Sequence, residues 1–287
     1  MQPAQEGEGT AIVLFAYDRP DALSRTIDSL NAARETWKRE RGGTSHLPLT
    51  VSLDGPRQTE ESRRRIREVR EMIARRLPDA SVHVQPMNRG LPTIILETLT
   101  PLFATPGVRR AICIEDDVEF APTLFLALET LAESLEGDAP NGRGYVIGAA
   151  PKHRDGSVEH QALLIDSVAH RATLPLLREY IDRFQLDGAA HDGAYGKRDH
   201  GAIAAWATAL AVSEGLQAPT GTSQDRMREL AWRRAGVSML GTPMRLVRHR
   251  GLWGQHNTPW YALRTGQLFQ RVDQRPWSLI KERLVAR

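Results

Sequence analysis

Short apolar runs alternate with amphipathic segments over the first 150 residues, and this alternation constrains the fold more than any other feature of the sequence. The runs are short and continuous, as are strands that a sheet buries on both faces. Between them, apolar residues recur every three or four positions, as on one side of a helix. We expect strands at residues 11–16, 49–53, 82–84, 111–114 and 145–147, and helices at residues 21–33, 59–76 and 92–103. This order predicts an α/β fold with a mostly parallel central sheet flanked by helices.

The composition is that of a globular protein: of 287 residues, 41% are hydrophobic and 25% are charged. The net charge is +3 and no basic stripe is interleaved with aromatic residues, so we expect no nucleic-acid partner. The N-terminus lacks a signal-peptide pattern and no run of about 18 apolar residues occurs, so we expect a cytoplasmic protein. The single cysteine, Cys113, lies in an apolar run and is expected to be buried and structural.

The pattern loosens in the second half of the chain. Residues 174–184 and 224–234 have helical spacing, whereas residues 185–201 are rich in Gly, Asp and His and are expected to form a loop. Residues 277–287 have the pattern of a short, basic amphipathic helix. We expect this helix either to lie on the protein surface or to make weak peripheral contact with an anionic membrane.

Polar residues follow the expected strands, at the positions where open α/β sheets bind their ligands. They are Tyr17, Asp18 and Arg19 after the first strand, Asp54 after the second, Asn88 and Arg89 after the third, and Glu115, Asp116 and Asp117 after the fourth. No G-x-G-x-x-G motif follows the first strand and no P-loop motif occurs, which disfavours dinucleotide-binding and P-loop proteins.

Glu115, Asp116 and Asp117 place three consecutive carboxylates at the end of an apolar strand. Their mutual repulsion and their desolvation predict that a cation or a network of donors offsets them. A divalent cation with oxygen ligands, Mg²⁺ or Mn²⁺, would do so. The alternative is a solvated acidic turn before the helix that follows Pro122, because acidic residues are favourable near a helix N-terminus.

Three separated blocks of the sequence resemble the GT-A glycosyltransferases, and most specifically the family of the N-acetylglucosaminyltransferase that initiates complex N-glycans. The blocks are residues 15–19, 50–55 and 113–122, in the family's order and at comparable spacing. The third block is the most specific. The resemblance implies a GT-A fold and a metal-dependent, inverting transfer of a sugar from a UDP-sugar donor to an acceptor hydroxyl. The sugar that the resemblance favours is N-acetylglucosamine.

The same resemblance implies roles for the acidic triplet. Asp117 would bind the Mn²⁺ or Mg²⁺ ion that bridges the donor diphosphate. Glu115 and Asp116 would face the sugar and the ribose of the donor. Residues 249–256 look like the late His-containing loop that completes the metal or diphosphate site in many relatives. In this loop His256 is our first choice as the ligand and His249 the second, and the alternative is a structural hydrogen bond.

Residues of the first two blocks would contact the nucleotide. The resemblance assigns Ala16, Tyr17 and Arg19 to donor binding, and gives Asp54 the place of the carboxylate that reads uracil, where a charged acceptor strengthens the hydrogen bond. Alternatives stay open, because Arg19 could form a surface ion pair and Asp54 could belong to an ordinary turn. Arg89 is expected to contact phosphate or ribose unless its segment serves only as a turn.

Inverting transfer needs a carboxylate that takes the proton of the acceptor hydroxyl. Residues 223–228 resemble the family's Trp-Asp-Asp-Trp-Met-Arg segment, in which Asp225 occupies the place of the base, although both tryptophans and the first Asp are missing here. Asp225 could instead be a first-turn acid in a helix capped by Thr222 or Ser223. Glu229, one turn onward, is the fallback.

On this interpretation residues 1–9 form a loose tail, 10–120 the nucleotide-sugar-binding half, 121–260 the acceptor-binding and catalytic half of the same GT-A domain, and 261–287 a C-terminal tail or helix. The acceptor could be a saccharide, a lipid-linked saccharide, a protein or a natural product. Two other classes stay open. One is a sugar-nucleotide pyrophosphorylase, whose usual Gly-rich phosphate loop is missing here, and the other is a non-catalytic nucleotide- or carbohydrate-binding module.

Overall fold

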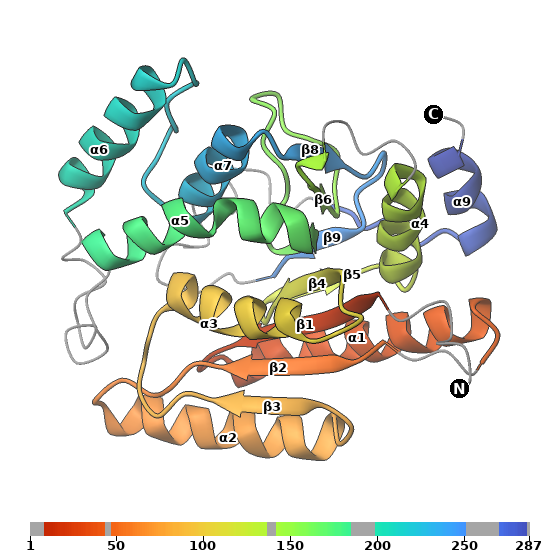
Figure 1. Cartoon of the computed structure of the whole chain (residues 1–287). Coiled ribbons are helices and arrows are strands. Elements are labelled where there is room, and N and C mark those ends of the chain that lie inside the picture. The colour runs from red at the N-terminus through yellow and green to blue at the C-terminus, as the bar shows by residue number, and fades with distance from the viewer. Residues whose placement is uncertain (1–8, 44–46, 137–141, 185–198, 251–269, 286–287) are drawn as a thin grey trace.

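The computed structural model describes residues 9–43, 47–136, 142–184, 199–250 and 270–285. In this part of the chain, helices cover both faces of a seven-stranded sheet (Figure 1). The strands lie in the order β3 (Ser81–Val84), β2 (Leu49–Leu53), β1 (Thr10–Ala16), β4 (Arg110–Glu115), β7 (Ala162–Asp166), β6 (Tyr145–Gly148) and β8 (Ser238–Gly241). β7 is antiparallel to both of its neighbours, and the other adjacent pairs are parallel. The predicted α/β fold with a mostly parallel sheet is confirmed.

The helices form two groups. One face of the sheet packs against α1 (Pro20–Glu40), α2 (Glu60–Arg76) and α4 (Leu124–Glu136), with α9 (Trp277–Val285) against α4. The other face packs against α3 (Leu91–Ala104), α5 (Ser167–Phe184) and α7 (Gln224–Ala235), with α6 (His200–Ser213) outside them. Along β1, Ile12 and Leu14 join the first core while Val13 and Phe15 join the second, as the alternation of a strand requires.

A second, two-stranded sheet joins segments that are far apart in the sequence. β5 (Val118–Phe120) pairs antiparallel with β9 (Val247–His249), and Val118 lies opposite His249. Because β5 begins directly after the acidic triplet, this pairing brings the β9 segment to the carboxyl end of β4.

The local sequence explains where several helices begin. α1 starts at Pro20, whose fixed φ suits the first helical position. Thr59 caps α2, because its side-chain oxygen accepts a hydrogen bond from the backbone N–H of Ser62 at 3.2 Å. Gly90 precedes α3 with a φ of 79°, a conformation that favours glycine.

The third strand is less buried than expected. Val82 and Val84 in β3 are 40% and 39% exposed, whereas we predicted a strand buried on both faces. The reason is its position, because β3 lies at the edge of the sheet and hydrogen-bonds only to β2.

We predicted a loop at residues 185–201. Residues 185–198 lie outside the described part of the chain, and for residues 200 and 201 the prediction is wrong because they belong to α6. Asp199 caps α6, with its carboxylate accepting a hydrogen bond from the backbone N–H of Ala202 at 2.8 Å. α6 carries small apolar residues on several sides instead of one apolar stripe. The periodicity that marks an amphipathic helix is therefore weak here.

The described part of the C-terminal segment is a helix, as predicted, and one side of it is used for packing. Ile280 and Leu284 of α9 are buried in the core that α4 shares. No helix within the described ranges is long and apolar enough to cross a membrane. Cys113 is buried as expected, and burial raises the pKa of its thiol to about 12.

Candidate functional site

Three adjacent parallel strands end at one edge of the sheet. Ala16 at the end of β1 lies opposite Leu53 at the end of β2, and Phe15 lies opposite Glu115 at the end of β4. The carbonyl oxygen of Ala16 accepts a hydrogen bond from the backbone N–H of Asp54 at 3.0 Å. The sheet therefore brings the polar segments that follow these strands close together.

Among the residues that the structure describes, Arg19 is the arginine that pairs with the acidic triplet. Its guanidinium group donates hydrogen bonds to both Asp116 and Asp117. The backbone N–H of Tyr17 donates a further bond to Asp116 at 2.7 Å. Burial by itself lowers the pKa of Arg19, but the charges of Asp116, Asp117 and Glu115 outweigh it and raise that pKa above its ordinary value. In this structure, a side chain of the same protein offsets two carboxylates of the triplet.

The two carboxylate oxygens of Asp117 differ in their hydrogen bonding. Its Oδ2 accepts hydrogen bonds from Arg19 and, at 2.9 Å, from Nε2 of His249. Its Oδ1 is buried and accepts no hydrogen bond from any residue that the structure describes. The carbonyl oxygen of Asp117 accepts a bond from the backbone N–H of Arg250 at 2.8 Å, which fixes the end of β9 beside it. A buried, unpaired carboxylate oxygen favours a cation or donor as its partner.

The three carboxylates of the triplet differ in their tendency to ionise. Burial raises the pKa of Glu115 well above its usual range. Burial also raises the pKa of Asp116, to about 6, although Arg19 opposes this. At Asp117 burial acts in the same direction, but Arg19 and His249 outweigh it and hold the pKa below its ordinary value. Asp117 is therefore the carboxylate of the three that is most firmly ionised at neutral pH.

The residues around Asp117 fit a divalent cation that is bound by few protein ligands. The open Oδ1 of Asp117 is a hard oxygen ligand, and the imidazole of His249 lies beside the same carboxylate. No group of three or more His, Cys, Asp or Glu side chains that could hold a metal is found among the described residues. A site with Asp117 as its carboxylate ligand and few other protein ligands matches the Mg²⁺ type, in which one or two carboxylates act together with substrate phosphates.

Asp54 is used within the protein in this structure. Its Oδ1 accepts hydrogen bonds from the backbone N–H groups of Gly55 and Arg89, both at 2.8 Å. Its Oδ2 accepts from Nδ2 of Asn88 at 2.9 Å and from the N–H of Gly90 at 3.0 Å. Burial nevertheless raises the pKa of Asp54 to about 6. Because a carboxylate offers about four acceptor positions, a contact with a base would have to displace one of these donors.

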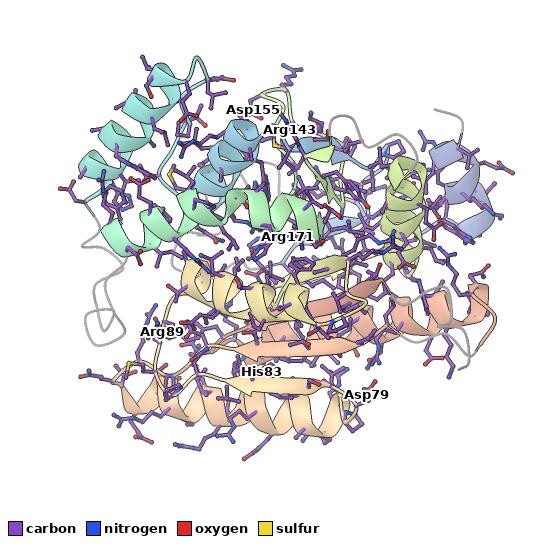
Figure 2. All side chains as sticks on the ribbon, in the orientation of Figure 1. Asp79, His83, Arg89, Arg143, Asp155 and Arg171 are labelled. Atoms are coloured by element: carbon purple, nitrogen blue, oxygen red, sulfur yellow. The ribbon has the colours of Figure 1, made fainter. Side chains whose placement is uncertain are left out.

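Tyr17 and Arg89 lie at the same edge of the sheet and have partners of their own. The hydroxyl of Tyr17 lies 3.5 Å from Oγ of Ser62, the guanidinium of Arg57 lies over its ring, and burial raises the pKa of Tyr17 to about 12. Nη2 of Arg89 donates to Glu97 at 2.9 Å, and its side chain is 34% exposed. Figure 2 shows Arg89 at the edge where β2 and β3 end.

Asp225 lies in the first turn of α7, and Ser223 caps this helix by accepting a hydrogen bond from the N–H of Arg226 at 3.4 Å. The negative charge of Asp225 contributes, after burial, to the raised pKa of Glu115, so the two carboxylates lie within electrostatic reach of each other. The side chain of Asp225 is 37% exposed. Glu229, the fallback base, is only 3% exposed and is held by other side chains.

His160 belongs to this cluster, although no motif in the sequence selects it. It precedes β7, and its Nε2 lies 2.9 Å from Oε1 of Glu229 while its Nδ1 lies 3.7 Å from Oδ1 of Asp225. Its ring stacks on Trp232 with a centroid distance of 5.3 Å. A single loop histidine has no spacing pattern that marks it, so only the fold reveals these partners.

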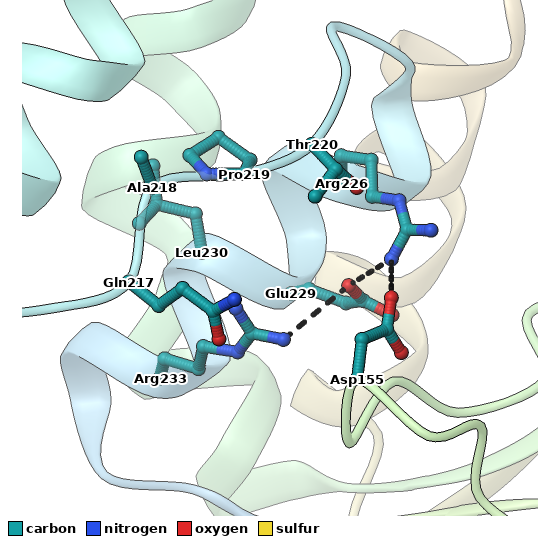
Figure 3. A pocket seen from close by; sticks show the side chains of 9 residues that line it. All are labelled: Asp155, Gln217, Ala218, Pro219, Thr220, Arg226, Glu229, Leu230 and Arg233. Carbon is teal, nitrogen blue, oxygen red and sulfur yellow. Dashed lines mark hydrogen bonds and ion pairs between the residues drawn. The ribbon is translucent and has the colours of Figure 1, made fainter.

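A small hollow lies on the far side of Glu229 from His160. Arg226 donates to Glu229 at 2.9 Å and to Asp155 at 3.3 Å, so this wall of the hollow is closed by ion pairs (Figure 3). The residues that line it are Asp155, Gln217, Ala218, Pro219, Thr220, Arg226, Glu229, Leu230 and Arg233. Of our candidate residues only Glu229 lines this hollow, so it is separate from the edge where the strands end.

His256, our first choice as the late ligand, lies outside the described residues, as does most of its loop. His249 is the histidine that the described part of the chain places beside Asp117. The structure thus brings together Tyr17, Arg19, the triplet and His249. Asp225 lies within electrostatic reach of Glu115, and Asp54 and Arg89 lie at the neighbouring strand ends.

Comparison with known proteins gives structural neighbours only. No family model and no curated protein sequence matches the chain. Among solved structures, 4-diphosphocytidyl-2C-methyl-D-erythritol synthase from Anaerococcus prevotii DSM 20548 is similar with a TM-score of 0.38 and 12% identity, over 68% of this chain and 86% of that chain. S. aureus TarS is similar with a TM-score of 0.35 and 14% identity, over 53% of this chain and only 23% of TarS. A fragment of S. aureus TarS, residues 1–349, is similar with a TM-score of 0.35 and 13% identity, over 58% of this chain and 48% of the fragment.

Proposed function

We propose that the protein is a GT-A glycosyltransferase that moves a sugar from a UDP-sugar to an acceptor hydroxyl, with inversion and with the help of Mn²⁺ or Mg²⁺. The observation that carries the proposal is a pair of carboxylates near Glu115 that have different surroundings. One is the ionised Asp117, with a buried, open oxygen beside His249, and the other is the partly exposed Asp225. Asp117 thus offers a place for a cation, and Asp225 offers a base.

In this proposal Asp117 holds the ion, with His249 or His256 as the second ligand. The ion would neutralise the diphosphate as it leaves the sugar. Arg19 also serves the diphosphate, because a guanidinium group binds phosphate oxygens as readily as carboxylates. Glu115 and Asp116 face the sugar and ribose of the donor.

The nucleotide would lie over the ends of β1 and β2. Ala16 and Tyr17 form the floor beside the triplet, and Arg89 approaches phosphate or ribose from the end of β3. Asp54 supports this part of the site by fixing the Asn88–Gly90 turn with three of its four accepted hydrogen bonds, and reads the base only if one of its four donors gives way. The identity of the sugar, N-acetylglucosamine, comes from the resemblance of the sequence blocks alone.

Asp225 is the proposed base. Its exposed carboxylate would accept the proton of the acceptor hydroxyl while the acceptor oxygen attacks the anomeric carbon and the bond from that carbon to the diphosphate breaks. Its neighbour Glu115, whose raised pKa favours the neutral form, adds little repulsion to an incoming diphosphate. The acceptor, a saccharide, lipid-linked saccharide, protein or natural product, would approach from the side of α7.

Calorimetric titration with UDP, in Mn²⁺ and in EDTA, tests the metal site. We expect Mn²⁺ to tighten UDP binding by at least about tenfold, or about 1.4 kcal/mol. Asp117→Asn should remove most of this difference, because it removes the charge that holds the ion.

The matched control is Asp79→Asn, which changes an exposed aspartate that Figure 2 places away from Arg89, at the other end of β3. This variant should retain the metal dependence. Equal affinity for UDP in Mn²⁺ and in EDTA would contradict the proposed metal site.

A further inference from the structure

His160 is a buried histidine whose two ring nitrogens face two different carboxylates. Its side chain is 9% exposed, and the ring is held nearly parallel to Trp232, with 8° between the planes. The backbone of the next residue, Gln161, accepts a hydrogen bond from the N–H of Glu115 at 3.0 Å. The histidine is therefore held beside both the acidic triplet and α7.

The Nε2 side of the ring is the firmly bonded side. Nε2 lies 2.9 Å from Oε1 of Glu229, and the other oxygen of Glu229 accepts from Arg226 at 2.9 Å. Burial by itself would raise the pKa of Glu229, but His160 and Arg226 outweigh it and hold that pKa below its ordinary value. An ionised carboxylate can only accept, so Nε2 carries the hydrogen that the bond requires.

The other ring nitrogen, Nδ1, is buried and has no hydrogen-bond partner among the residues that the structure describes. Oδ1 of Asp225 lies 3.7 Å from it. With the hydrogen on Nε2, a neutral ring presents the lone pair of Nδ1 to this carboxylate. Two acceptors then face one another, and the addition of one proton between them creates the missing hydrogen bond.

The surrounding groups hold this arrangement in place. Asp225 accepts a bond from Nε2 of Gln224 at 3.1 Å, and Arg233 lies 3.9 Å from Glu229. The guanidinium of Arg228 lies over Trp232, the residue on which His160 stacks. The charged groups facing the histidine are thus Asp225 and Glu229, with arginines on the outer side of Glu229.

From this geometry we infer that His160 is a positioning residue for Asp225 that also takes over its proton, with Glu229 as the anchor of the ring. The inference rests on the proposed role of Asp225 as the base. The acceptor O–H bond breaks and its proton moves to Asp225, from which it moves to Nδ1 of His160. The imidazolium ion then lies between the carboxylates of Asp225 and Glu229, and Asp225 is ionised again.

NMR of the protein with ¹⁵N-labelled histidine tests the arrangement without any substrate. The His160 signals are assigned by their loss in His160→Gln. The inference requires, at the pH of the kinetic assay, a ring that carries its hydrogen on Nε2 and has none on Nδ1. A hydrogen on Nδ1 instead, or a ring protonated at both nitrogens, would overturn the inference because neither form can accept a proton at Nδ1.

Steady-state kinetics tests the role. His160→Gln keeps a donor for Glu229 but has no group that takes a proton, so we expect kcat to fall roughly 10- to 100-fold, below the 10²- to 10⁴-fold that a general base contributes. KM for the donor and UDP affinity should stay unchanged, and the dependence of kcat on pH should change its shape. His153→Gln, an exposed histidine of the same segment, is the control.

The outcomes separate the two proposals. A His160→Gln enzyme with the wild-type kcat and pH profile overturns the relay and leaves the transferase proposal standing. A wild-type protein that turns over no UDP-sugar contradicts the transferase proposal itself, whatever the tautomer of His160.

Discussion

At the scale of single residues, Arg19 offsets the negative charge of two carboxylates of the candidate site. It pairs with both Asp116 and Asp117 and is itself 30% exposed, so it can be reached from solvent. A divalent cation on Asp117 and a diphosphate on Arg19 would each replace one side of this pairing. Ligand binding would then exchange an internal ion pair for two ion pairs with the ligand, which keeps the buried carboxylates compensated throughout.

Arg19→Gln tests this exchange. In EDTA the variant should lose about 1–3 kcal/mol of unfolding free energy, less than the loss of a partner from a fully buried pair, because Arg19 is partly exposed. Mn²⁺ should stabilise the variant more than the wild type, because the ion no longer competes with a guanidinium group. Urea unfolding with and without Mn²⁺ measures both effects.

Arg34→Gln is the control, because it removes an arginine that pairs with the exposed Asp79. Its response to Mn²⁺ should equal that of the wild type. If Mn²⁺ stabilises Arg19→Gln no more than the wild type, Arg19 does not compete with a cation.

The sequence could predict candidate residues that stand at strand ends or match a motif, but not their partners. The resemblance to the GT-A family is what selects Asp117 for metal binding and Asp225 as the base. His160 could not be selected, because its partner Glu229 lies 69 residues further on and the two meet only through the fold. For Asp54, the sequence indicated neither the number nor the source of the donors that surround it.

At the scale of elements, the buried strands β1, β2 and β4 lie where their continuous apolar runs predicted them. β5 and β9 have three residues each and pair across more than a hundred residues, so no local pattern could reveal them. These two strands nevertheless place His249 beside Asp117. The part of the site that local periodicity could not predict is thus built by the shortest elements.

Asp54 links two elements, because its carboxylate at the end of β2 holds the turn that leads into α3. Asp54→Asn places an amide N–H₂ group opposite donors that need an acceptor. We expect a loss of about 1–3 kcal/mol of unfolding free energy for each donor left unsatisfied. Chemical denaturation measures it, with the exposed Asp28→Asn as the control. A change no larger than that of the control would show that these bonds add little stability.

At the scale of the whole molecule, β7 joins the two halves of the chain. It pairs antiparallel with β4 on one side and with β6 on the other, so the later strands continue the sheet that the first four began. The segment before β7 carries His160. Helix α7 packs on the same face of the sheet as α3 and α5 (Figure 1). Asp225 therefore lies close enough to Glu115 for its charge to act on that carboxyl, although the two come from different halves of the chain.

The most direct test of the proposed function is the rate at which UDP is released from UDP-N-acetylglucosamine, and from other UDP-sugars, in Mn²⁺, by the wild type and by Asp225→Asn. We predict turnover by the wild type and a rate lower by about 10²- to 10⁴-fold in the variant, with UDP affinity unchanged. A variant that releases UDP at the wild-type rate would contradict the assignment of Asp225 as the base. No release by the wild type from any UDP-sugar would contradict the transferase itself.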